Sequence, residues 1–139
     1  MSSTLLPPDY VPSDDEEFMN PMMREFFRQR LLEWRNELLR ESDQTLLNMQ
    51  QVSLQEPDIT DRASLETERA LELRTRDRER KLISKIDSAL RRIDTGDYGY
   101  CDDTGEPIGL KRLIARPIAT LSLEAQEQHE RMEKTHRED

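Results

Sequence analysis

Cysteine and long apolar runs are both scarce in this chain of 139 residues. A single cysteine excludes an internal disulfide, and no run of about 18 apolar residues exists that could cross a membrane. The first residues lack a basic segment followed by an apolar one, so we expect no secretory signal. Together these absences predict a soluble, cytoplasmic protein.

Basic residues and hydrophobic residues are also few. The chain has 21 Lys and Arg residues against 30 Asp and Glu residues, a net charge of −9. Binding DNA phosphates requires an excess of cations, so the balance argues against a free-standing DNA-binding protein. Only 34% of residues are hydrophobic and 5% are aromatic, too few for a large core. A long two-helix element needs only one apolar stripe per helix, and we therefore expect a mostly α-helical fold.

The sequence pattern divides the chain into three parts. Residues 1–21 hold four of the seven prolines and five acidic residues but no Lys or Arg, which predicts a loose acidic N-terminal arm. Residues 22–94 predict a long antiparallel coiled-coil hairpin with its tip at 55–63. Residues 95–139 contain all four glycines, which predicts a small turn-rich module followed by a C-terminal helix.

Apolar residues in steps of three and four support the hairpin. The seam consists of Phe27, Leu31, Trp34 and Leu38 in the first helix and of Leu82, Ile86, Leu90 and Ile93 in the second. Toward the tip both stripes become polar, so we expect an apolar base and a polar tip. Two helices of about 30 residues, at about 1.5 Å per residue, would extend roughly 45 Å.

Four positions in the module have the spacing of a zinc site. If all were cysteine, they would read C-x2-C-x17-C-x2-C, a four-thiolate pattern. The residues present are Cys101, Thr104, Ser122 and Ala125. Hydroxyl groups are poor zinc ligands at neutral pH and alanine has no donor, so we expect no metal here. The module must then be held by apolar packing of Leu110, Leu113, Ile114, Ile118 and Leu121.

Three motifs carry a resemblance to a known family. They are FFRQRLLEWRNELL, DRASLETERALELRTRDRERKLISKI and DYGYCDDTGEPIGLKRLIARPIATLSLEAQ. They resemble the DksA family, bacterial RNA polymerase-binding transcription factors with a coiled-coil hairpin and a small zinc-finger globular domain. The resemblance covers about residues 18–137. Because only Cys101 remains of the four cysteines, the chain resembles the cysteine-poor, zinc-independent type, with a zinc-finger-like module that is metal-free.

The resemblance implies a function in transcription. In this family the hairpin inserts through the secondary channel of RNA polymerase and its tip approaches the catalytic centre. It implies action with the alarmone ppGpp in the stringent response, with repression of ribosomal RNA promoters and help to amino-acid biosynthesis promoters. We expect bacterial RNA polymerase and ppGpp as partners, a monomer, no direct promoter DNA binding and no enzymatic activity.

The hairpin tip carries Asp58, Asp61 and Ala63. Taken alone, the two aspartates fit turn and helix N-cap roles. They also fit a pair of carboxylates that reaches a metal ion, or groups near one, in a partner's active centre. The resemblance favours the second interpretation, because the family's tip carries this pair and an alanine.

Basic residues gather along the second helix between residues 74 and 92, where eight Lys and Arg residues outnumber three Asp and Glu residues. Arg74, Arg78, Lys81 and Lys85 recur in steps of 4, 3 and 4 and share one face. Such a face fits a solvated helix side with ion pairs, such as Asp77 with Lys81. It equally fits a site for a phosphate-rich ligand.

The resemblance favours the ligand site. Positions where DksA and polymerase jointly bind ppGpp match Arg78, Lys81, Leu82, Lys85 and Arg116, with Arg74 on the same face. Gln126 stands near a position where the family often has lysine, which removes one phosphate contact.

Two other functions remain open, as does the role of the thiol. One is a transcript-cleavage accessory like the Gre factors, in which the tip acids would help hold a catalytic metal. The other is a coiled-coil scaffold. We interpret Cys101 as a buried or half-buried remnant of a four-cysteine ancestor rather than a redox sensor, because the anionic Asp102 and Asp103 should disfavour a thiolate.

Overall fold

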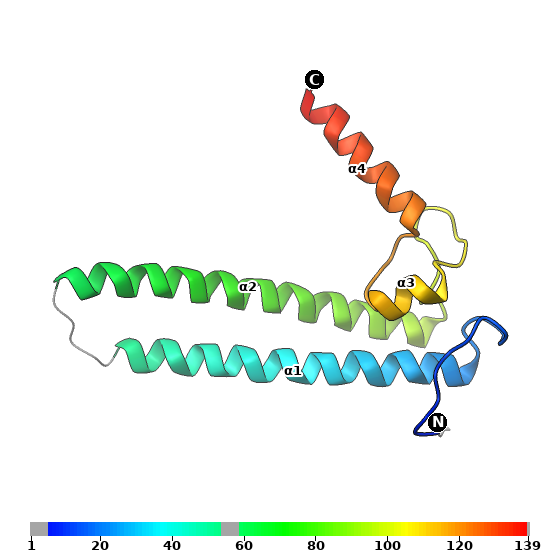
Figure 1. Ribbon diagram of the computed structural model, residues 1–139, viewed down its shortest axis with the longest axis horizontal. Helices are drawn as coiled ribbons and strands as arrows, with labels where there is room; N and C mark the ends of the chain where they lie inside the picture. Colours follow the sequence, from blue (N-terminus) through cyan, green and yellow to red (C-terminus); the bar gives the residue numbers. More distant parts are fainter. Residues whose placement is uncertain (1–5, 54–58, 139) are drawn as a thin grey trace. The chain divides into compact units, whose positions relative to one another are not determined.

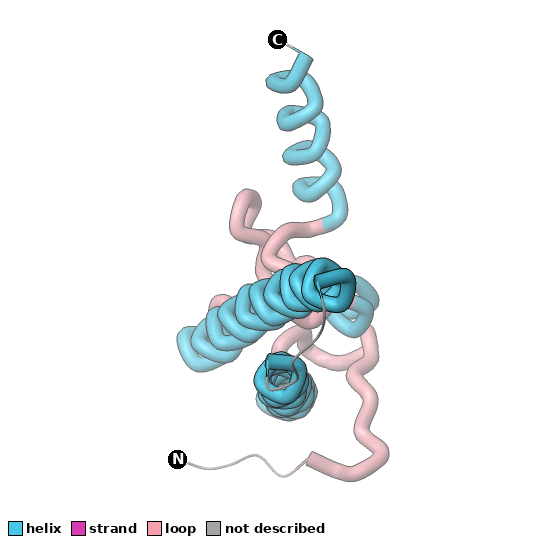
Figure 2. The backbone as a smooth tube through the Cα atoms, turned by 90° about the vertical axis from the view of Figure 1, so that its left-hand side faces the viewer, coloured by secondary structure: helices cyan, strands magenta, loops and turns pink. Residues whose placement is uncertain are grey.

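The computed structural model describes residues 6–53 and 59–138, and in these ranges it contains helices and loops but no strand (Figure 2). The mostly helical fold predicted from composition is thereby confirmed. None of the described helices is both long enough and apolar enough to cross a membrane. The chain divides into two compact units, which are Met1–Leu31 with Ser88–Asp139, and Leu32–Asp87.

Helix α1, Pro21–Ser53, begins at a proline that directly follows the capping residue Asn20. The Asn20 side chain accepts a hydrogen bond from the Met23 N–H at 2.9 Å, as expected of an N-cap residue. Proline suits the first helical position because its missing N–H would have no partner there. Pro21 is therefore the start of α1, whereas the sequence analysis placed it in the arm.

Helix α2, Ile59–Thr95, ends at a left-handed glycine. Gly96 has φ 85°, and its N–H donates to the Ile93 carbonyl at 3.3 Å. The N–H of Asp97 donates to the Arg92 carbonyl at 2.9 Å, which completes a Schellman motif. This cap ends the helix and directs the chain into the module.

Within the unit Leu32–Asp87, α1 and α2 lie side by side and run in opposite directions (Figure 1). The Arg35 guanidinium bonds the Asp87 carboxylate at 2.7 Å. Leu38 and Ile86 of the predicted seam are buried, and Trp34 and Leu82 are half-buried. The predicted antiparallel hairpin is confirmed in this unit.

The unit that contains the module has the larger core. It buries Met23, Phe27 and Leu31 of α1 and Ile93 of α2, together with Tyr98. The rings of Phe27 and Tyr98 lie 5.5 Å apart, and the Tyr98 hydroxyl donates to the Pro117 carbonyl at 2.7 Å. An ion pair between Arg28 and Asp94 also joins α1 and α2 here.

The module contains one short helix that the sequence pattern did not predict. Helix α3, Leu110–Ala115, has only six residues, too few for an apolar period to be recognised. Of the five residues expected to hold the module, Leu110, Leu113 and Ile118 are buried, and the other two, Ile114 and Leu121, are half-buried. The chain then continues into α4, Leu123–Glu138.

The acidic arm is not loose where it is described. The Phe18 ring packs edge-on against Tyr100 at 5.6 Å, and Met19 is buried. A Cβ added to Gly99, which has φ 92°, would lie 3.1 Å from the Met19 side chain, so this side chain packs directly against the Gly99 backbone. Composition missed this packing because two adjacent apolar residues make no period.

Candidate functional site

Three of the four positions with zinc-site spacing meet at one sulfur atom, and the fourth is hydrogen-bonded to one of these three. Cys101 is buried, and its Sγ accepts a hydrogen bond from the Ser122 N–H at 3.4 Å. The Thr104 hydroxyl also bonds this sulfur. Ser122 Oγ in turn accepts a hydrogen bond from the Ala125 N–H at 3.2 Å, and Ala125 is buried. Hydrogen bonds thus link the four positions, and their correspondence to a zinc site stays a prediction.

Backbone hydrogen bonds form the loop that carries this cluster. The Cys101 N–H donates to the Glu106 carbonyl, and the Gly105 N–H returns to the Cys101 carbonyl, both at 2.8 Å. The Asp102 N–H donates to the Thr120 carbonyl at 2.8 Å. These bonds fix the segment around Cys101 against the loop before Ser122 without any metal ligand.

The donor set at the cluster does not fit zinc. Structural zinc sites use four Cys or His ligands, whereas these positions offer one sulfur, two hydroxyl groups and one methyl group. One hydroxyl is already the N-cap of α4 and the other bonds Cys101. Among the described residues, no group of three or more His, Cys, Asp or Glu side chains is placed to hold a metal.

The expected ionisation of Cys101 was wrong in direction. Burial raises the pKa of the thiol, but hydrogen bonds from Ser122, Thr104 and Asp103 outweigh it and lower the pKa to about 6. The carboxylates of Asp102 and Asp103, which we expected to disfavour a thiolate, are paired elsewhere. The short-range donors therefore decide the charge state.

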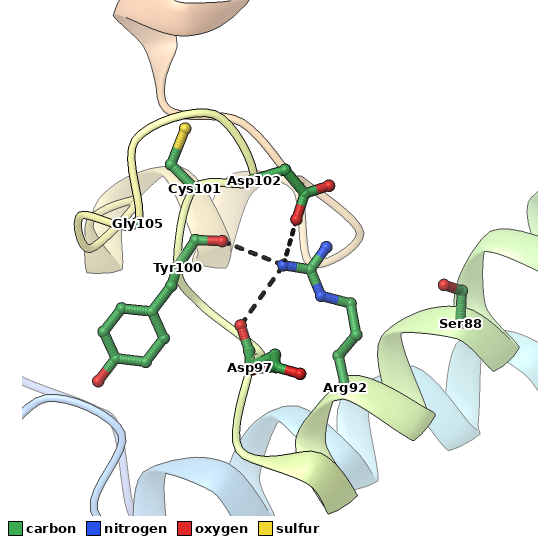
Figure 3. Close-up of a pocket in the computed structure, with 7 residues that line it drawn as sticks. All are labelled: Ser88, Arg92, Asp97, Tyr100, Cys101, Asp102 and Gly105. Atoms are coloured by element: carbon green, nitrogen blue, oxygen red, sulfur yellow. Dashed lines mark hydrogen bonds and ion pairs between the residues drawn. The ribbon is translucent and has the colours of Figure 1, made fainter.

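Arg92, which the sequence analysis did not single out for this role, ties α2 to the loop around Cys101 (Figure 3). Its Nη2 donates to the carbonyls of Asp97 and Tyr100 at 3.4 and 3.1 Å and pairs with the Asp102 carboxylate at 2.8 Å. An open polar pocket of about 630 Å³ surrounds this guanidinium. Its lining residues are Ser88, Arg92, Asp97, Tyr100, Cys101, Asp102 and Gly105.

A second polar contact links the same loop to α4. His129 Nε2 lies 2.6 Å from the Asp103 carboxylate. The His129 side chain is 51% exposed. The contact itself has no signal in the sequence, because the two residues are 26 positions apart. Asp102 and Asp103 thus reach α2 and α4 respectively.

The predicted basic face lies along α2 as its spacing requires. Arg74, Arg78, Lys81 and Lys85 are exposed, and none of them forms an ion pair with a described residue. The pair between Asp77 and Lys81 that the solvated-helix alternative anticipated is therefore not formed. Four unpaired cations on one helix face are available to an anionic ligand.

The two other residues assigned to this site lie in different surroundings. Leu82 is half-buried in α2. Arg116 has an exposed side chain at the C-terminus of α3, where its N–H donates to the Arg112 carbonyl at 2.7 Å. Because Arg116 and the basic face belong to different compact units, their joint action stays a prediction.

The tip residues are described only in part. Asp58 lies outside the described residues. Asp61 belongs to the first turn of α2, but its side chain also lies outside the described part. Ala63 is exposed, and its carbonyl accepts a hydrogen bond from the Thr67 hydroxyl at 3.1 Å. The role of the tip stays a prediction.

Comparison with known families assigns both parts of the chain. Residues 23–93 match the family described as "DnaK suppressor protein DksA, N-terminal domain". Residues 96–131 match the "Prokaryotic dksA/traR C4-type zinc finger". The second match covers all four positions with zinc-site spacing, although three of them are not cysteine.

Individual relatives agree with this assignment. The "RNA polymerase-binding transcription factor DksA" of Caulobacter vibrioides is 63% identical over 94% of this chain and 92% of its own length. The protein of the same name from Escherichia coli is 46% identical over 83% of this chain and 76% of its own.

A solved structure agrees as well. Transcription factor DksA2 from Pseudomonas aeruginosa superposes with a TM-score of 0.80 at 43% identity, covering 84% of this chain and 90% of that one. The resemblance on which the sequence analysis relied is therefore confirmed, and the chain belongs to the DksA family.

Proposed function

We propose that this protein is a transcription factor that binds bacterial RNA polymerase and inserts its hairpin through the secondary channel. The observation that carries the proposal is the 63% identity, across 94% of the chain, to a relative named for polymerase binding. The antiparallel pairing of α1 and α2 supports it, because a paired hairpin is the element expected to enter the channel. The protein acts as a monomer in the cytoplasm, without enzymatic activity and without binding promoter DNA itself.

The module does this work without zinc. Its cluster offers a single thiolate, and the positions of the other three ligands are used for a hydroxyl bond to sulfur, a helix cap and core packing. Arg92 and His129 add links from this loop to α2 and α4. These contacts connect the segments that zinc ligands would otherwise join.

The basic face supplies a site for ppGpp in the complex with polymerase. The ligand carries several phosphate charges, and Arg74, Arg78, Lys81 and Lys85 are exposed and unpaired among the described residues. With Leu82 and Arg116 they form the set that the family resemblance implies. With ppGpp bound, the factor represses ribosomal RNA promoters and aids amino-acid biosynthesis promoters in the stringent response.

Transcription in vitro from a ribosomal RNA promoter, with and without ppGpp and in the presence of a zinc chelator, tests the proposal. The wild-type protein should inhibit, and ppGpp should deepen the inhibition despite the chelator. Asp61→Asn, and Asp58→Asn to a lesser degree, should abolish inhibition while polymerase binding persists, because the tip lies away from the long contact surface. Much weaker binding of both variants would make the tip an anchor instead.

Single substitutions on the basic face test the ppGpp site. Lys85→Ala and Arg78→Ala should weaken the ppGpp-dependent part of inhibition by about tenfold or more, since a hydrogen bond to a charged group contributes roughly 1.5–3 kcal/mol. Arg80→Ala is the matched control, because Arg80 is exposed on another side of α2. Equal loss of ppGpp-dependent and ppGpp-independent inhibition would show that these residues only dock the protein.

A further inference from the structure

The interior of the unit Leu32–Asp87 contains very few buried side chains. Among its described residues only Leu38, Glu79 and Ile86 are buried. Glu79 is 6% exposed, and it is the one charged residue that is buried in the described part of the chain. A carboxylate therefore takes a position in the helix seam where the pattern calls for an apolar side chain.

One of the two oxygens of the Glu79 carboxylate is buried without a partner among the described residues. Its Oε2 is buried and receives no hydrogen bond from any described residue. Arg76 lies one turn earlier on the same side of α2, yet its buried Nε likewise donates no hydrogen bond to the described part of the chain. No ion pair between described residues includes Glu79.

Hydroxyl groups near this seam bond their own helices. The Thr75 hydroxyl, one turn before Glu79, donates to the Leu71 carbonyl at 3.0 Å. On α1, the Thr45 hydroxyl donates to the Glu41 carbonyl at 2.9 Å. Both donors are satisfied locally, so neither stabilises the buried acid.

A carboxylate oxygen that is buried without a partner opposes the packing that buries it. Regions with few buried apolar contacts also open more readily than the rest of a structure. We propose that Glu79 makes the middle of the hairpin a weak point, at which α1 and α2 separate locally while the unit that contains the module stays folded. A hairpin that opens locally can bend to fit the walls of a channel. This role in channel entry rests on the proposed function, whereas the local separation of α1 and α2 does not.

Amide hydrogen exchange of the full chain, followed by mass spectrometry, tests the weak point directly. Glu79→Leu replaces the acid by an apolar side chain of similar size, and Glu79→Gln removes only its charge. Exchange of peptides from residues 42–51 and 63–79 should slow by roughly tenfold or more in Glu79→Leu and by less in Glu79→Gln. Peptides of the module should not change.

Glu68→Leu is the matched control, because Glu68 is exposed on the same helix. Unchanged or faster exchange in both Glu79 variants, or equal slowing in Glu68→Leu, would overturn the proposal. With polymerase added, the same peptides of the wild type should gain more protection than those of Glu79→Leu. If polymerase protects no peptide at all, the proposed function fails, while the exchange of the free proteins still decides the role of Glu79.

Discussion

At the scale of single residues, Arg92 and Cys101 make the polar contacts that hold the loop of the module. Arg92 bonds two carbonyl groups and one carboxylate of the loop around Cys101. Cys101 keeps a sulfur surrounded by N–H and O–H donors. Arg92 therefore joins the end of α2 to the loop, whereas Cys101 joins the loop to Ser122, 21 positions away, and each residue leads to a test.

Arg92→Met should destabilise the protein. The substitution leaves the carbonyl of Tyr100 and the carboxylate of Asp102 without their donor, and the side chain that is lost is only 19% exposed. We expect a loss of roughly 2–3 kcal/mol in the free energy of unfolding, measured by urea denaturation. Arg91→Met is the control, because Arg91 is exposed and should change stability little. Equal effects of the two substitutions would contradict a linking role for Arg92.

Cys101 predicts a dependence of stability on pH. Its pKa is lowered to about 6 in the folded protein, below the value of about 8.5 for an unfolded chain. Between these values the unfolded state binds the proton and the folded state does not, so stability rises with pH over this window. The contribution is present above the unfolded value and is lost as the pH falls through about 6.

Melting temperatures of the wild type and of Cys101→Ala, compared at several pH values, measure this contribution. The difference between the two proteins should grow from pH 6 to pH 9 in favour of the wild type. A difference that stays constant with pH would mean that the thiol remains protonated in the folded protein. Cys101→Ser should retain transcriptional activity, and a peroxide-induced loss that this substitution prevents would instead make Cys101 a sensor.

At the scale of elements, helix ends decide where the segments of the module begin and stop. Asn20 caps α1, Gly96 ends α2, and Ser122 caps α4. At position 122 a serine stands where a zinc-binding relative would have a cysteine ligand, and its hydroxyl group acts as the N-cap of α4. The signals at Asn20 and Gly96 are local and visible in sequence, whereas that at Ser122 was interpreted as a lost ligand.

Ser122→Ala should weaken α4 and its attachment. Its Oγ would no longer accept the hydrogen bond from the Ala125 N–H, and loss of such a cap costs typically about 1 kcal/mol. We expect a lower melting temperature and a smaller helical signal by circular dichroism. Ser122→Asp preserves capping and should restore most of the stability. If both variants behave alike, the cap does not hold α4.

At the scale of the whole molecule, the chain consists of one unit with a substantial core and another with almost none. The unit with the module buries aromatic and aliphatic side chains from the arm, both long helices and α3. The unit Leu32–Asp87 depends on few buried residues and on the ion pair between Arg35 and Asp87.

Zinc should be dispensable for the fold. Elemental analysis of the purified protein should show far less than one zinc per chain, because a single thiolate cannot form a four-ligand site. A chelator should leave the helical signal and the melting temperature unchanged. A four-cysteine DksA relative, treated in parallel, should lose stability and serves as the control. Stoichiometric zinc in this protein would show that ligands other than the four positions are used.

The sequence alone determined the helical hairpin and the family. Each of these follows from local periods, fixed spacings or long motifs, which can be recognised without the tertiary structure. Tertiary structure decided the packing of Phe18 against Tyr100, the triple contact of Arg92 and the contact of His129 with Asp103.

The charge state of Cys101 and the burial of Glu79 likewise depended on tertiary structure. Sequence neighbours suggested the wrong ionisation, because the donors that lower the pKa include Ser122, which is 21 positions away. The physical reason is common to all of these features. A hydrogen bond, an ion pair or a buried charge depends on which distant groups meet in space, whereas a helix period depends only on the residues within a few turns.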